Sequence, residues 1–326
     1  MSTFSNKIIP IRVEKTIPQR YKVIEWKIHN TCNYNCSFCA SSNKDGSESW
    51  LTLDQYKVGI DKIAKACEGS PYYIIYTGGE PTLYPKFIEL LKYSKSKGAF
   101  TILISNGART LRWWKELVQE NCLDRLTITY HSEQTDNYKH IADVMNLFHD
   151  MPTETCCEIT HTRHTIDQAF NGFQYLIENT GGVMDIKGMN ITDYNIYDMY
   201  TAEQLEFIKN NNYRRGINSG TKKTTSIPLV LRISSLLTIT YDTGHRELVD
   251  LQSIFKNQKN SFTGWNCDVG KDFLRIVHDR VYRSVCEVTG VVGSLYDDNI
   301  SFFNDTVICD KHRCVCFTDI TATKIK

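Results

Sequence analysis

The sequence has 326 residues, and its 38 Lys and Arg against 37 Asp and Glu give a formal net charge of +1. This length predicts one large domain or two smaller ones, with a sizeable buried core in either case. A hydrophobic fraction of 41% and a charged fraction of 23% exclude a disordered or collagen-like chain, and no apolar run approaches the length of a membrane helix. The balanced charge gives no support for nucleic-acid binding, so we expect neither a membrane nor a long nucleic acid as partner.

The cysteines are the unusual part of the composition. Since Met1-Ser2-Thr3-Phe4 begins neither an apolar signal core nor a cleavage site, we expect a cytoplasmic protein. Thiols stay reduced in the cytoplasm, so twelve cysteines indicate metal binding or catalysis before disulfides. Eight of them fall into two clusters, one near the N-terminus and one in the last sixty residues. The other four are interpreted as buried apolar side chains: Cys67, Cys122, Cys156 and Cys157.

Strand-like and helix-like segments alternate over the first two thirds of the chain. Runs rich in β-branched and aromatic residues predict strands at 23–28, 72–76, 100–104, 126–130, 157–160 and 184–191. Helical periodicity follows each run, at 53–63 after the expected N-cap Thr52, then at 87–91, 113–118, 138–149, 166–178 and 202–210. Six β-then-α units predict an α/β fold with a parallel sheet, and periodicity alone does not separate an open sheet from a partial barrel.

The pattern changes after residue 210. Residues 211–228 are polar and basic with two glycines, which indicates a solvated linker rather than a phosphate-binding patch. Residues 229–241 predict a pair of strands, and 262–320 combine the late cysteines with glycines, aspartates and little helical period. Such a segment is typical of a small module stabilised by metal. The expected domains are an N-terminal extension (1–20), the β/α domain (21–210), the linker (211–228) and a cysteine-rich module (229–326).

The first cluster consists of Cys32, Cys36 and Cys39, directly after the first predicted strand. Spacings of four and three let the three thiolates converge on one metal centre from a single loop. A structural zinc site needs four ligands, so zinc requires a fourth such as His29. A 4Fe-4S cluster held by three cysteines instead leaves one iron open to another ligand.

The spacing C-x3-C-x2-C, with Phe38 before its last cysteine, resembles the motif of the radical S-adenosylmethionine (SAM) enzymes. Gly78-Gly79-Glu80-Pro81 after the second strand is similar to the glycine-rich motif with which that family binds the SAM amine, and Ser105-Asn106-Gly107 follows the third strand. The resemblance covers roughly residues 21–210. It implies a partial (β/α)6 TIM-like barrel with its ligands at the C-terminal ends of the strands.

The resemblance also implies cofactors and an activity. The open iron would bind the amino and carboxylate groups of SAM, and one electron would split SAM into methionine and a 5′-deoxyadenosyl radical that abstracts hydrogen from a substrate. Gly78 and Gly79 would let the backbone approach SAM, Glu80 would face its ammonium group, and Phe38 would pack near the adenine. Ser105 and Asn106 would contact the ribose or carboxylate. An electron donor such as flavodoxin or ferredoxin is expected.

The second cluster resembles the auxiliary modules, called SPASM or twitch domains, of many radical SAM enzymes. Its members are Cys267, Cys286, Cys309, Cys314 and Cys316. A full SPASM domain uses about seven cysteines, so five favour a shortened, twitch-like module with one auxiliary 4Fe-4S cluster. Val281 stands where the family often has a glycine, and the last spacing also differs. A zinc knuckle is the alternative, and the choice between Cys314 and Cys316 as fourth ligand stays open.

Polar residues at the ends of the fourth and fifth strands are candidates for substrate contact. His131 and Glu133 are expected catalytic residues, because both can reach the barrel mouth and a histidine titrates near neutrality; a structural histidine is the alternative. Glu158 and Arg163 are expected to bind SAM or a substrate carboxylate. The function is then hydrogen abstraction from a small-molecule, nucleotide or peptide substrate. With about thirty residues before Cys32, a peptide would need a separate recognition partner, and a non-catalytic metal scaffold is the other class.

Overall fold

The computed structural model describes residues 9–326 except 20, 135, 163, 181–183, 191–200, 204–205, 207–214, 217–235 and 317. The chain forms two compact units. The β/α unit comprises Glu25–Ala64 and Tyr72–Ile227, and the terminal unit comprises Met1–Ile24, Lys65–Pro71 and Pro228–Lys326. No helix in the described part of the chain is both long and apolar enough to cross a membrane.

The β/α unit is built on a mainly parallel sheet. Its strands follow one another in chain order: β2 (Lys22–Lys27), β3 (Tyr72–Thr77), β4 (Phe100–Ser105), β5 (Arg125–His131), β6 (Glu154–His161) and β7 (Met184–Asn190), with the short antiparallel β8 (Arg215–Gly216) at the edge. Neighbours from β3 to β7 pair in parallel. All six predicted strands are therefore confirmed, as expected for a partial barrel.

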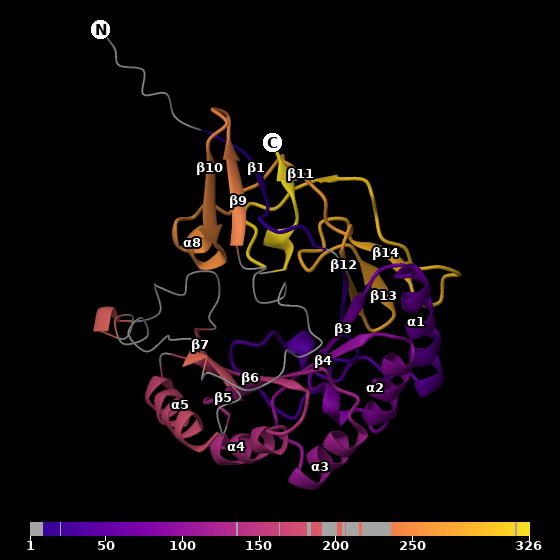
Figure 1. The fold of residues 1–326 in the computed structure, drawn as a ribbon, viewed down its shortest axis with the longest axis vertical. Coiled ribbons are helices and arrows are strands. Elements are labelled where there is room, and N and C mark those ends of the chain that lie inside the picture. The colour runs from indigo at the N-terminus through magenta and orange to yellow at the C-terminus, as the bar shows by residue number, and fades with distance from the viewer. Residues whose placement is uncertain are drawn as a thin grey trace. The chain divides into compact units, whose positions relative to one another are not determined.

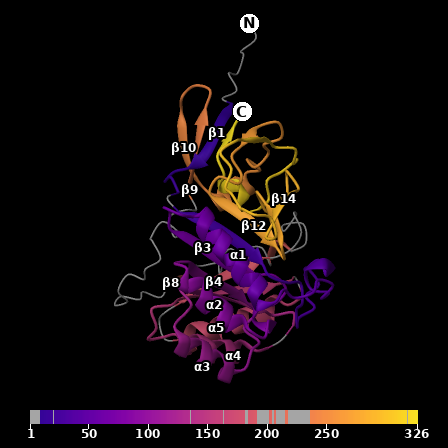
Figure 2. The ribbon, with the colours of Figure 1, turned by 90° about the vertical axis from the view of Figure 1, so that its right-hand side faces the viewer.

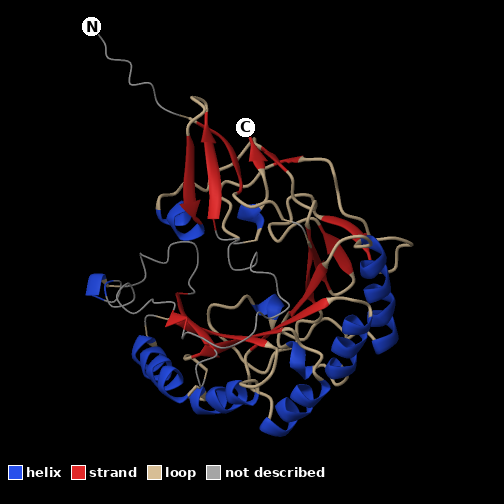
Figure 3. Cartoon of the chain, viewed as in Figure 1, coloured by secondary structure: helices blue, strands red, loops and turns tan. Residues whose placement is uncertain are grey.

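Five helices cover one face of this sheet, outside the curve of the strands (Figures 1 and 3). They are α1 (Leu53–Ala66), α2 (Phe87–Ser96), α3 (Leu111–Glu120), α4 (Tyr138–Leu147) and α5 (Ile166–Asn179). Thr52 caps α1 as predicted, since its Oγ1 accepts from Gln55 N at 3.2 Å and the Gln55 side chain accepts from Thr52 N. The predicted helix at 202–210 lies largely outside the described residues.

Large aromatic side chains fill the space between the sheet and its helices. Trp26, Tyr56, Tyr76, Trp114 and Tyr130 are fully buried. The Tyr56 hydroxyl, on α1, donates to Ile28 O at 2.8 Å just past the end of β2. This contact fixes the point at which the chain leaves the strand and enters the cysteine loop.

The terminal unit contains a six-stranded sheet in the order β10-β9-β1-β16-β11-β15. Its strands are β1 (Pro10–Lys15), β9 (Leu236–Tyr241), β10 (Arg246–Asp250), β11 (Asn266–Cys267), β15 (Val307–Ile308) and β16 (Lys324–Ile325). β1 lies beside β9 and pairs antiparallel with both β9 and β16 (Figures 1 and 2). The expected N-terminal extension thus supplies an inner strand of this sheet.

The rest of the described part of this unit consists of a hairpin, a meander and two short helices. Of the strand pair expected at 229–241, residues 229–235 lie outside the described residues, and 236–241 form the single strand β9, whose hairpin partner is the later β10. A meander of β12 (Phe273–Val277), β13 (Arg280–Tyr282) and β14 (Val291–Ser294) follows, with the short helices α8 (Leu251–Lys256) and η4 (Asp319–Thr321). The unit also has an apolar core of its own: Val13, Leu237, Ile239, Val249, Ile254, Phe262, Trp265, Cys309, Cys314 and Ile320. This core was not expected from the sequence, because the segment has little helical periodicity to indicate a buried face.

Candidate functional site

The first three cysteines lie in one loop after β2, and all are free thiols. Cys36 is buried, while Cys32 and Cys39 are partly exposed. Lys44 Nζ donates to Cys36 O at 2.6 Å, and a bridge between Thr31 and Asp45 closes the base of the loop. Burial raises the pKa of the Cys36 thiol to about 12. Because iron binds the thiolate, loading this loop must release protons.

The end of β5 holds the cysteine loop from the other side. Glu133 Oε2 accepts from Ser37 N, and Gln134 Oε1 accepts from Asn35 N, both at 2.9 Å. His131 Nδ1 lies 3.6 Å from Cys36 Sγ. The structure thus brings His131 and Glu133 to the cysteine loop, where they position it; their catalytic role stays a prediction.

Two aromatic rings enclose the His131 imidazole. Phe38 stacks on it with ring centroids 6.0 Å apart, and Tyr34 meets it edge-on at 5.7 Å. Burial lowers the pKa of His131 to about 4. The imidazole is therefore neutral at physiological pH, and it faces the Cys36 sulfur with either a donor or an acceptor nitrogen.

The glycine pair after β3 packs against the start of the cysteine loop. Gly79 N donates to His29 O at 2.9 Å, and Glu80 N donates to Thr31 O at 2.8 Å. A Cβ on Gly78 would lie 2.3 Å from His29 O, and one on Gly79 would lie 2.1 Å from Thr31 O. We expected these glycines to make room for a ligand. In the structure two backbone segments of the chain also approach each other closely at both positions, so the fold itself leaves no room for a Cβ there. The role of the two glycines toward SAM stays a prediction.

Glu80 connects three segments that the sequence analysis singled out. Its side chain is 1% exposed, and its carboxylate accepts from Thr82 N (3.1 Å), Thr82 Oγ1 (2.6 Å), Ser105 Oγ (2.8 Å) and Asn106 N (2.7 Å). Burial raises the pKa of Glu80, and these four hydrogen bonds oppose that effect. Three of these donors bind Oε1 and one binds Oε2, so the carboxylate links the glycine motif to the end of β4. Its contact with the SAM ammonium stays a prediction.

Asn106 extends this network to the cysteine loop. Its side-chain amide donates to Asn33 Oδ1 at 2.9 Å, and Asn33 directly follows Cys32. The motif after β3, the end of β4 and the cysteine loop are therefore hydrogen-bonded to one another. Three of the residues expected to contact SAM, Glu80, Ser105 and Asn106, are brought together by this arrangement.

The structure describes only one of the two candidates at the fifth predicted strand, which is β6. Glu158 lies on β6, in register with Thr129 of β5 and Lys187 of β7. Arg163 lies outside the described residues. Glu158 and Arg163 thus remain predictions as SAM or substrate contacts.

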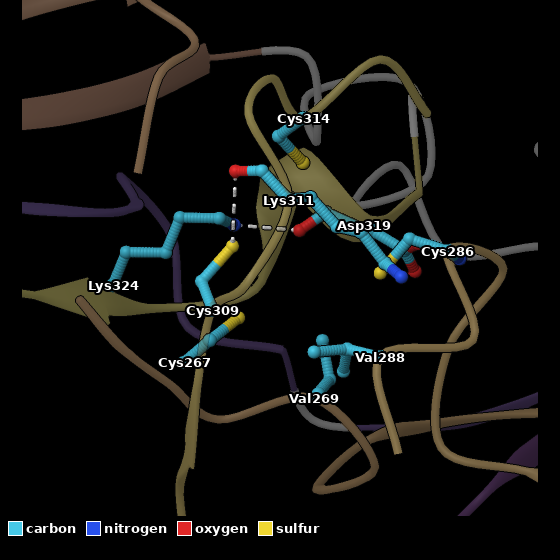
Figure 4. A pocket seen from close by; sticks show the side chains of 9 residues that line it. All are labelled: Cys267, Val269, Cys286, Val288, Cys309, Lys311, Cys314, Asp319 and Lys324. Carbon is cyan, nitrogen blue, oxygen red and sulfur yellow. Dashed lines mark hydrogen bonds between the residues drawn. The ribbon is translucent and has the colours of Figure 1, made fainter. Parts of the chain in front are cut away.

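Four late cysteines line one pocket in the terminal unit (Figure 4). Cys267, Cys286, Cys309 and Cys314 carry their sulfurs around a common space, whose wall also includes Val269, Val288, Lys311, Asp319 and Lys324. The empty volume of this pocket is about 320 Å³, including the part that is open to solvent. Cys316 is not in this wall; its Sγ accepts from Thr318 N at 3.4 Å. Of the two cysteines left open by the sequence, Cys314 and not Cys316 lies in the wall of this pocket.

The donor set of this pocket is four thiols, the ligand type of both a 4Fe-4S cluster and a structural zinc ion. Among the described residues, which include all twelve cysteines, no three His, Cys, Asp or Glu side chains converge closely enough to hold one metal ion. Burial raises the pKa of Cys286 and of Cys314 to about 12, so a metal bound by these thiols would displace protons.

Two residues of the pocket escaped the sequence analysis. The Asp319 carboxylate accepts from Val285 N (3.1 Å) and Cys286 N (2.6 Å), which fixes the loop that carries Cys286. Lys324 is buried beside the cysteines. Neither Asp319 nor Lys324 belongs to a recognisable motif or has a characteristic sequence spacing from a cysteine, so no sequence pattern indicated them. Gln134 was missed as well, although it directly follows the singled-out Glu133.

Comparison with known proteins decides the family. The model of the radical SAM superfamily matches residues 26–199, more than half of the chain. The protein belongs to the radical SAM superfamily. It is a radical SAM enzyme, so the scaffold alternative is set aside. The family implies a 4Fe-4S cluster and SAM, and the three thiols of the loop at Cys32–Cys39 provide the donors that such a cluster requires.

Curated relatives of this radical SAM enzyme match over short stretches. An Fe-coproporphyrin III synthase of Methanosarcina barkeri is 31% identical over 103 residues, which cover 31% of this chain and 25% of the relative. A probable GTP 3′,8-cyclase of Sulfurisphaera tokodaii is 30% identical over 122 residues, covering 35% and 36%. The chain therefore spans about a quarter to a third of the length of these relatives.

Solved structures agree with the fold over most of the chain. The structure of a hexahistidine-tagged anSMEcpe with bound AdoMet has a TM-score of 0.53 at 13% identity, covering 86% of this chain and 79% of the other. SuiB of Streptococcus suis bound to its precursor peptide SuiA has a TM-score of 0.52 at 12% identity, covering 85% and 63%. At such low identity the likeness concerns the fold alone.

Proposed function

We propose that this radical SAM enzyme cleaves SAM reductively, abstracts a hydrogen atom from its substrate, and is assisted by one auxiliary 4Fe-4S cluster in the terminal unit. Four buried or half-buried thiols around one pocket carry the auxiliary part of the proposal. Reductive scission of the SAM sulfur–carbon bond is the chemistry that the first cluster supplies when bound. An electron donor such as flavodoxin or ferredoxin would deliver the electron.

The assigned ligands are Cys32, Cys36 and Cys39 for the first cluster, and Cys267, Cys286, Cys309 and Cys314 for the second. Three ligands leave one iron free for SAM, and four ligands close the other site. This difference in count separates a catalytic from an auxiliary role. An auxiliary cluster with four protein ligands is suited to accept an electron and not to bind the substrate.

The residues around the first site hold and shield it. Glu133 and Gln134 fix the backbone of the cysteine loop, and Glu80 ties the glycine motif to the end of β4. Phe38 lies over the imidazole of His131, on the loop where SAM would bind. Rigid support of this kind keeps an iron ligand set in place and limits access of water.

The substrate is proposed only by class: a small molecule, a nucleotide or a peptide. Among the relatives named above, one is a synthase of an iron porphyrin and one a cyclase of GTP. A peptide substrate would need a separate recognition partner. Deuterium transfer from labelled candidates into 5′-deoxyadenosine distinguishes the classes, because only a true substrate gives up its hydrogen to the cofactor fragment.

The test of the two-cluster proposal compares iron in three anaerobically reconstituted proteins. The wild type should hold about eight irons, and the Cys32/Cys36/Cys39→Ala variant about four. That variant should not form 5′-deoxyadenosine from SAM, while a variant lacking the four late ligands should still do so. Zinc or no metal in the first variant refutes the auxiliary cluster, and SAM cleavage by it refutes the first site.

A further inference from the structure

Lys324 is a buried cation beside the four late cysteines. It lies on β16, its side chain is 1% exposed, and it lines the same pocket as Cys267, Cys309 and Cys314 (Figure 4). Nζ donates to Asp319 O at 2.6 Å and to Ala322 O at 2.9 Å, and it lies 5.1 Å from the centroid of the Phe262 ring. These partners carry partial charges only.

The described part of the chain shows no carboxylate paired with this ammonium group. Asp319 is the acid in the pocket wall, and its carboxylate is directed to the amides of Val285 and Cys286. Burying a charge without a counter-charge is costly, and lysine is rarely this buried unless it is paired. An anion in the pocket would offset this energetic cost of burying the Lys324 ammonium group.

Four cysteine thiolates bound to a 4Fe-4S cluster form such an anion. The ligated cluster carries net negative charge, and it gains one more negative charge when it accepts one electron. A positive charge held close to it favours both occupancy and, more strongly, the reduced form. The other lysine in the wall, Lys311, differs from Lys324: its side chain is 38% exposed and lies 3.5 Å from Asp310.

We propose that Lys324 is the counter-charge of the auxiliary cluster and holds its reduction potential up. The inference rests on the proposed function for the presence of that cluster. Lys324, which is not a cluster ligand, would then determine which electron donors and acceptors can exchange an electron with the terminal unit.

A redox titration tests this in the Cys32/Cys36/Cys39→Ala background, where the auxiliary cluster is alone. Iron content is measured first, and electron paramagnetic resonance then follows the reduced cluster against applied potential. Lys324→Met removes charge and donors, and Lys324→Gln keeps a donor without the charge. Both should lower the ratio of reduced to oxidised cluster at least tenfold at the midpoint of the parent, which is 59 mV for a one-electron couple.

The matched control is Lys311→Met, which should shift the midpoint much less because Lys311 is exposed and paired. Full iron with an unchanged midpoint in both Lys324 variants overturns the inference while leaving the cluster in place. Absence of iron from the parent that still has Lys324 refutes the proposed function instead. The two failures are therefore distinct.

A second measurement covers variants that hold iron poorly. Thermal unfolding of the full chain is compared with iron loaded and after chelation. A counter-charge predicts that Lys324→Met lowers the unfolding temperature of the loaded chain more than that of the chelated chain. An equal drop in both states would indicate a lysine that only caps the end of η4, and would overturn the proposal.

Discussion

Replacing Gly79 by alanine should destabilise the fold itself. The new Cβ would lie 2.1 Å from Thr31 O, 2.5 Å from Thr31 C and 2.9 Å from Asn30 C, whereas ordinary contacts begin at 3.4 Å. The glycine loop must therefore move by about 1 Å, because all three neighbours are backbone atoms. That movement weakens the bonds from Gly79 N to His29 O and from Glu80 N to Thr31 O.

The magnitude follows from these contacts. Two backbone hydrogen bonds contribute about 1 kcal/mol each, and overpacking costs about 1–3 kcal/mol, so Gly79→Ala should lower the free energy of unfolding by about 3–5 kcal/mol. Urea unfolding of the full chain after chelation measures the loss without any cofactor. SAM binding by the loaded protein should weaken as well, since the displaced loop carries Glu80.

Gly98→Ala is the matched control. Gly98 has a φ of +86° but nothing within 4 Å of its Cβ position, so only backbone strain of about 1 kcal/mol is expected. If Gly79→Ala kept the stability of the wild type and lost only SAM binding, the ligand would be the reason for the glycine. The contact with Thr31 would then not be the constraint.

Three further predictions concern single side chains. Because burial raises the pKa of Glu80, its contribution to the free energy of unfolding is largest below its ordinary pKa of 4.5 and falls as pH rises through the raised pKa. Urea unfolding between pH 4 and 7 should therefore show the stability of Glu80→Gln increasing relative to that of the wild type as pH rises. Parallel stability curves for the two proteins would contradict this. Cys314→Ser should remove about four irons and Cys316→Ser none, by iron analysis; the reverse result would make Cys316 the ligand. Glu133→Ala should speed the loss of the first cluster to a chelator and cost about 1 kcal/mol, whereas Glu133→Gln keeps an acceptor for Ser37 N and should behave as wild type. Equal rates for the two Glu133 variants would exclude this hydrogen bond as the anchor.

Local patterns predicted the β/α unit well, and long-range proximity explains what they missed. The apolar run at 72–76 predicted the strand β3, and Thr52 as N-cap followed by helical spacing predicted α1. The close packing of Gly79 depends on its distance from Thr31 in the folded chain, and no local sequence pattern predicts that distance. Likewise, only the folded terminal unit separates Cys314 from Cys316, because one faces the pocket and the other is turned to Thr318 N.

The pairing of β1 bears on how this chain comes to be assembled. Val13 pairs with Ile239 on one side and with Lys324 on the other, so this sheet joins positions from opposite ends of the sequence. During synthesis β1 emerges first but has no partner until the whole β/α unit has been made. Contacts of such sequence separation form slowly, and domains made earlier tend to fold first. The loop at Cys32–Cys39 can thus be ready for iron while the ribosome is still translating the late cysteines, which would give the two sites an order of loading set by topology.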